Sequence, residues 1–156
     1  MEAFVAFKYL HIASMFFAVA LAISGELVLR QVANSRDAGA IRVTAARVKP
    51  LANLSTVLFL LGVVFGVVAA LTGNMNLLAP WLILAYAGFL AAMAIGITVT
   101  DPWVGRLEKA AEAKLADGSS DALDAVIDEP LARAGTWALM FLVAFLVFTM
   151  VVKPLS

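Results

Sequence analysis

Hydrophobic residues in this chain gather into four long runs that alternate with polar segments. The runs cover residues 7–29, 51–72, 81–100 and 134–152. Each is close to the roughly 20 residues that a helix needs to cross the hydrocarbon core of a bilayer. The pattern predicts an all-α integral membrane protein, in which residues 1–156 form a single transmembrane domain with the fold of a four-helix bundle.

Basic residues are concentrated in the two longer connections, 30–49 and 101–133, whereas only Lys8 and Lys153 lie at the other ends of the helices. Because basic residues are retained on the cytoplasmic side, both connections are expected in the cytoplasm and both termini outside. We expect a bacterial cytoplasmic (inner) membrane. The run Ala18–Ala22 resembles a signal-peptidase site, but cleavage there would start the basic segment outside, so we expect the first helix to be retained.

Prolines mark the expected helix boundaries. Pro50 and Pro80 suit first-turn positions, where a missing N–H costs nothing, and Asp101-Pro102 and Lys153-Pro154 are expected to end the third and fourth helices. The tryptophans fall near span ends, where indole rings settle among lipid headgroups, and are interpreted as anchors. These are Trp81, Trp103 and Trp137.

A short internal similarity relates the two halves of the chain. Lys49-Pro50-Leu51-Ala52 opens the second predicted span, and Glu129-Pro130-Leu131-Ala132 precedes the fourth. Each follows a span and a charged connection, so the bundle is predicted to contain two helical hairpins in the same orientation, which is the arrangement of parallel repeats in transporters.

Composition narrows the possible chemistry. The chain is 63% hydrophobic and 14% charged, has zero net formal charge and contains no cysteine. No nucleic-acid partner is expected, and disulfides, thiolate metal sites and a cysteine nucleophile are excluded. Histidine, methionine and carboxylates remain as candidate ligands.

Small residues recur at helical spacing on three of the spans, and such stripes allow close approach of membrane helices. They are Ser14, Ala18, Ala22 and Gly25 on the first, Gly62, Gly66, Ala70 and Gly73 on the second, and Gly88, Ala92 and Gly96 on the third.

His11 is the only histidine in the chain. At about 100° per residue it shares an arc with Met15, Ala18 and Glu26, so it is expected to face the bundle or a partner helix. An imidazole there should be bound to something, because an unpaired polar group in a membrane is costly. Three roles stay open: a hydrogen bond to backbone or Tyr86, haem ligation, or copper binding with methionine sulfur.

Thioether and imidazole ligands together suit copper. The predicted topology places several methionines in the outer half of the bilayer with His11, namely Met1, Met15, Met75 and Met150.

The segment Lys8-Tyr9-Leu10-His11, the glycine-rich second span, Pro80-Trp81 and the terminal Val152-Lys153-Pro154 together resemble a family of four-helix membrane proteins of unknown function, DUF2269. The opening Lys8-Tyr9-Leu10-His11-Ile12, followed by a small-residue helix that ends at Gly25-Glu26, is more distantly similar to the copper-resistance D-like and protoporphyrinogen oxidase J-like membrane proteins. The resemblance implies that His11 binds haem or metal. With no second histidine, a b-type haem would be five-coordinate, take a methionine such as Met150, or lie between two protomers that each supply His11.

Two further groups of charged residues have simpler interpretations. Glu26 is expected to reach the interface or pair with Arg30 at i+4, and the acidic run 121–129 is expected to be a solvated helix face rather than a metal site. The function expected from the sequence is haem-linked redox chemistry or electron transfer. The alternatives are a non-catalytic accessory subunit of a membrane complex and a copper-handling protein, and a homo-oligomer or larger membrane complex is expected in each case.

Overall fold

The structure is a computed structural model that describes residues 2–118 and 121–154. Within these residues it contains no strands, and four helical stretches are long and apolar enough to cross a membrane. The predicted all-α four-helix membrane bundle is therefore confirmed. The elements are α1 (Glu2–Asn34), α2 (Ala38–Thr72), α3 (Pro80–Ile95), the π-helical segment η1 (Gly96–Thr100), α4 (Asp101–Asp117), α5 (Asp121–Ile127) and α6 (Pro130–Val152).

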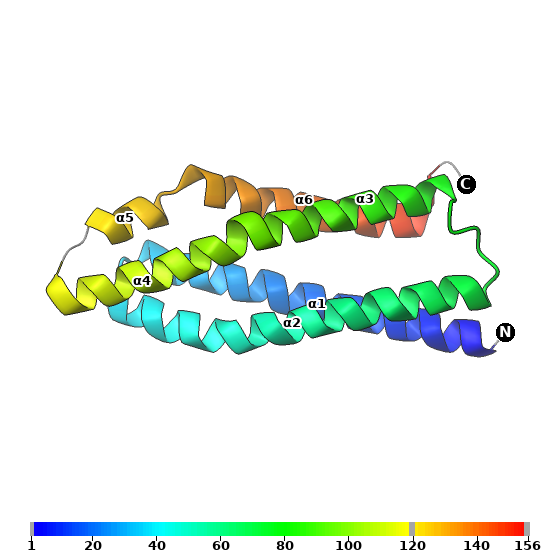
Figure 1. Ribbon diagram of the computed structural model, residues 1–156, viewed down its shortest axis with the longest axis horizontal. Helices are drawn as coiled ribbons and strands as arrows, with labels where there is room; N and C mark the ends of the chain where they lie inside the picture. The colour runs from blue at the N-terminus through cyan, green and yellow to red at the C-terminus, as the bar shows by residue number, and fades with distance from the viewer. Residues whose placement is uncertain (1, 119–120, 155–156) are drawn as a thin grey trace.

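The helices form two hairpins that lie side by side (Figure 1). One is α1 with α2, and the other is α3 with α6; α3 continues through η1 into α4. Both chain ends lie at one end of the molecule, which we call the terminal end, and α4 and α5 lie at the opposite, charged end (Figure 1). Each hairpin starts at the terminal end, so the two share one orientation, as predicted.

Glycines of α2 receive large side chains of α1. A Cβ on Gly73 would lie 2.8 Å from the Phe4 ring, one on Gly66 2.7 Å from His11 Nδ1, and one on Gly62 3.0 Å from Met15. A methyl group at Gly73 or Gly66 would force the ring of Phe4 or His11 to shift, and one at Gly62 would make the Met15 side chain give by a few tenths of an ångström. The small-residue stripe of the second span is therefore a packing face, as its spacing predicted.

Two other predicted stripes have different outcomes. On α1, Ser14, Ala18 and Gly25 are buried, and Ser55 Oγ of α2 donates a hydrogen bond of 2.8 Å to Ala18 O. On the third span, a Cβ on Gly88 would lie 3.2 Å from Leu146 and 3.3 Å from Phe145, so Gly88 packs closely as predicted, whereas a Cβ on Gly96 would meet nothing within 4 Å. Gly96 is therefore not a close-packing position; it begins the π-helical segment.

The predicted connection 30–49 is wrong as a loop, because it is helical except at the turn 35–37. Asp37 caps α2 by accepting a hydrogen bond of 3.0 Å from Ala40 N, and Ile41 and Ala45 are buried against α4. Pro50 consequently lies inside α2 rather than in a first turn. The Asp37 cap and the packing against α4 therefore extend α2 toward its N-terminus, beyond the apolar run 51–72.

The connection 101–133 is also mostly helical. Asp101-Pro102 does not end the third helix, since Pro102 lies in the first turn of α4, directly after η1. The buried residues Trp103, Leu107 and Ala111 recur every four positions on α4, so their packing favours a continued helix. Pro80 at the start of α3 and Lys153 at the end of α6 lie where the sequence predicted.

The hydrophobic core lies at the charged end and joins α1, α2, α4, α5 and α6. Trp103, 1% exposed, is one of its largest members, so its interpretation as a headgroup anchor is wrong. In the apolar windows of the four spans, by contrast, only 17–22% of residues are buried in the protein. Most of that apolar surface therefore requires lipid as its solvent.

Candidate functional site

His11 projects from α1 toward α2, and its Nδ1 lies 2.7 Å from the backbone oxygen of Gly62. A carbonyl oxygen only accepts hydrogen bonds, so Nδ1 carries the hydrogen. In the neutral imidazole the lone pair is then on Nε2. The expected hydrogen bond to backbone is therefore present, whereas Tyr86, the other predicted partner, lies on α3 with 42% of its surface exposed.

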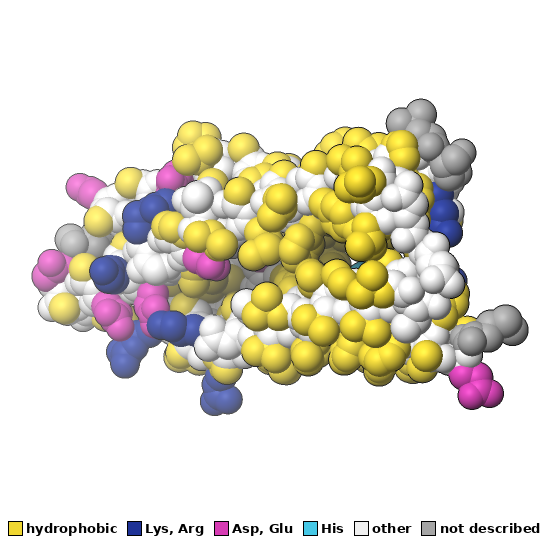
Figure 2. Space-filling view, turned by 45° about the vertical axis from the view of Figure 1, so that its right-hand side comes forward, with side chains coloured by type: hydrophobic (Ala, Val, Ile, Leu, Met, Phe, Trp, Pro, Cys, Tyr) yellow, Lys and Arg dark blue, Asp and Glu magenta, His cyan; other side chains and the backbone are white. Residues whose placement is uncertain are grey.

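Nε2 of His11 has no hydrogen-bond partner among residues 2–118 and 121–154. His11 is half-buried, and its Nε2 is not fully enclosed; in these segments Thr100 Oγ1 is the one unpaired side-chain polar atom that is. Figure 2 shows histidine, in cyan, inside a hollow between the two hairpins. His11 thus combines one anchored nitrogen with one available nitrogen.

The hollow is bordered mainly by hydrophobic side chains (Figure 2). The hairpins contact each other chiefly at the charged end, through α4 and α5. Within the membrane spans, the rings of Phe59 on α2 and Phe89 on α3 lie 6.2 Å apart. The site beside His11 is therefore apolar and lies where the two hairpins separate.

The two predicted methionine ligands have different positions. Met15 packs against Gly62, the residue whose carbonyl accepts from His11, so Met15 and His11 share a neighbour on α2. Met150 lies on α6 in the other hairpin and is 38% exposed. Within the described segments no group of three or more His, Asp or Glu side chains could hold a metal ion.

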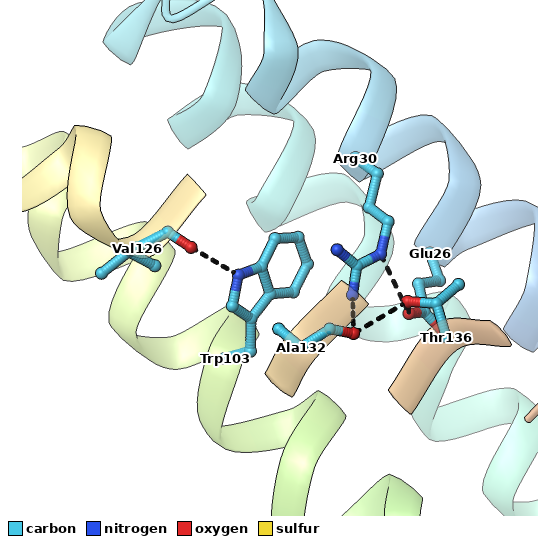
Figure 3. Close-up of polar contacts among 6 residues, drawn as sticks. All are labelled: Glu26, Arg30, Trp103, Val126, Ala132 and Thr136. Atoms are coloured by element: carbon cyan, nitrogen blue, oxygen red, sulfur yellow. Dashed lines mark hydrogen bonds and ion pairs between the residues drawn. The ribbon is translucent and has the colours of Figure 1, made fainter. Parts of the chain in front are cut away.

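A second polar cluster joins the hairpins near the charged end, and we call it the Glu26–Arg30 junction (Figure 3). Arg30 Nε lies 3.2 Å from Glu26 Oε1, which confirms the predicted pair, and Arg30 Nη2 donates to Ala132 O of α6 at 2.5 Å. The single hydroxyl hydrogen of Thr136 on α6 is donated to Glu26 Oε1, the shorter of its two contacts, and the same Oγ1 lies 3.1 Å from Ala132 O. The arginine thus binds a carboxylate on its own helix and a carbonyl on the opposite hairpin.

Trp103 completes the junction. The Arg30 guanidinium lies 4.3 Å above the centre of the Trp103 ring. Trp103 Nε1 donates a hydrogen bond of 3.0 Å to Val126 O. Sequence reasoning missed Trp103 and Thr136. The sequence signal for the burial of Trp103 was the apolar residue at every fourth position, Leu107 and Ala111. Nothing in the sequence links Thr136 to Glu26.

The acidic run 121–129 is ion-paired in part, beyond the solvated face that was predicted. Asp124 and Asp128 lie 2.5 and 2.9 Å from the guanidinium of Arg36, in the α1–α2 turn, and Glu129 lies 2.6 Å from Arg106. The hydrogen bonds and charges of the two aspartates raise the pKa of Arg36 above its ordinary value. Arg36 therefore stays charged, and α5 is held to the α1–α2 turn.

No protein-family model matches this chain, and neither the curated proteins nor the solved structures gave a match.

Proposed function

We propose that this protein binds a b-type haem through Nε2 of His11, in the hollow between the hairpins, and takes part in electron transfer or haem-linked redox chemistry. The observation that carries the proposal is that the two nitrogens of one imidazole differ: Nδ1 donates to Gly62 O, and Nε2 has no partner among the residues that the structure describes. Histidines that bind metals usually donate the other ring hydrogen to a carbonyl or carboxylate, which fixes tautomer and orientation.

The chain's own residues would provide three things. The Gly62 carbonyl orients the His11 ring, the absent side chain of Gly66 gives that ring its space, and the apolar hollow keeps water from the ligand. Haem, when bound, supplies reversible one-electron chemistry at iron. Met150, or His11 of a second protomer, would be the second residue to bind the haem iron. Self-association in a bacterial inner membrane with both termini outside is part of this proposal.

The first test is the visible spectrum of the protein purified in mild detergent. We expect a Soret band that is absent from His11→Ala. Gly66→Ala should lose at least tenfold in haem affinity, because its Cβ would lie 2.7 Å from Nδ1 and would displace the ring while leaving the histidine in place.

Gly105→Ala is the matched control, because it is also a helical glycine and a Cβ there meets nothing within 4 Å. It should bind haem like the wild type. A colourless wild-type protein that takes up no added haem would contradict the proposal. Copper found in that sample, and lost in His11→Ala, would favour copper handling, and a sample free of both would favour an accessory subunit.

A further inference from the structure

The terminal end carries two cations, one on each hairpin. Lys8 lies on α1, three residues and therefore about 4.5 Å of helix rise from His11 toward that end, and Lys153 follows the last residue of α6. Figure 2 shows dark-blue side-chain atoms at the end of the molecule nearer the histidine. The remaining charged side chain at this end of the described chain is Glu2, in the first turn of α1.

Both lysines are held beside aromatic rings rather than beside acids. Lys8 Nζ lies 5.8 Å from the ring centre of Phe4, and Lys153 Nζ lies 5.2 Å from that of Trp81. Neither has a carboxylate partner in residues 2–118 and 121–154. Each ammonium group therefore keeps hydrogen-bond donors available for an anion at the membrane surface.

The rings are themselves fixed. Phe4 packs against Gly73 of α2, and Trp81 is 9% exposed at the start of α3. Lys153 adopts φ 49°, and its N–H donates to Thr149 O. Each hairpin thus carries one exposed lysine beside a packed aromatic ring.

We infer that Lys8 and Lys153 bind the two carboxylates of the ligand that His11 holds, so that the ligand lies in the hollow with its acidic edge toward the terminal end. This inference rests on the proposed haem site and assigns its recognition of the two propionates. An apolar ring system suits the hollow, and two carboxylates suit two ammonium groups that have no acidic partner within the described part of the chain.

The test compares ferric haem with its dimethyl ester, in which both carboxylates are capped. Each is titrated into the purified full chain in detergent, and the Soret change gives the dissociation constant. For each protein we take the ratio of the dissociation constant of the ester to that of haem. This ratio should be about tenfold larger for the wild type than for the double variant Lys8→Gln/Lys153→Gln. Comparing ratios removes the different partition of the two compounds into detergent.

Lys109→Gln is the control, because Lys109 is an exposed lysine on α4 at the opposite end; it should keep the wild-type ratio. An equal ratio in the wild type and the double lysine variant would overturn the inference while leaving haem binding intact. A wild type that binds neither compound would instead contradict the proposed haem site. Circular dichroism of each variant checks that the helices are retained.

Discussion

At the scale of single residues, two polar side chains within the first membrane span, Glu26 and His11, differ in their hydrogen-bond partners. Glu26 Oε1 accepts hydrogen bonds from Arg30 on its own helix and from Thr136 on α6. His11 is engaged at Nδ1 alone. Helix rise places the two about 22 Å apart, so they form separate sites. We expect Glu26 to stabilise the fold and His11 to bind a ligand.

Glu26→Gln should destabilise the protein by about 2–3 kcal/mol, because it leaves the largely buried Arg30 without its counter-charge. Thermal unfolding in detergent measures the loss. Thr136→Ser, which keeps the hydroxyl that donates to Glu26, should cost less than about 1 kcal/mol. An unfolding temperature for Glu26→Gln equal to that of the wild type would show that the pair contributes nothing.

At the scale of elements, the chain combines two kinds of helix packing. In the membrane, α2 offers glycines into which Phe4, His11 and Met15 of α1 fit. At the charged end, α4 instead brings bulky side chains into a core shared with α1, α2 and α5. The first kind aligns two helices with each other, and the second joins the hairpins into one molecule.

Trp103→Ala should therefore cost about 3–5 kcal/mol, since it empties a core position and removes the ring beneath Arg30. The matched variant is Trp137→Ala, whose tryptophan is 68% exposed on α6. We expect that change to cost less than about 1 kcal/mol in detergent unfolding, since no core position is vacated. Equal losses for the two tryptophans would refute the assignment of the core.

At the scale of the whole molecule, both chain ends lie at one end and α4 with α5 at the other (Figure 1). The apolar spans between them leave most of their surface to lipid. The surplus of basic residues beyond α1 and at the start of α2 favours the charged end as the cytoplasmic end. The His11 site would then be reached from the outer half of the membrane.

This orientation is testable because the chain contains no cysteine. A cysteine introduced by Lys153→Cys should react in intact cells with a maleimide that does not cross membranes. Lys109→Cys should react only after the cells are opened. The reverse pattern would invert the topology and place the His11 site on the cytoplasmic side.

The sequence by itself determined the four spans, the shared orientation of the hairpins, the glycine face of α2 and the inward direction of His11 and Glu26. These features depend on local properties: the length of an apolar run, the 3.6-residue period and the size of single residues. The Glu26–Arg30 pair belongs with them, because i+4 neighbours meet on any helix.

Only the tertiary structure decided where the helices end and which atoms remain available. Residues 38–49 and 101–117 are helical because Asp37 caps α2 and because Ile41 packs with Trp103 and Leu107 in one core. Arg30 meets Ala132 across 102 residues of chain, and His11 meets Gly62 across 51. A local pattern does not encode such contacts, since they depend on how whole helices pack, and so the free Nε2 of His11 becomes visible only in the folded molecule.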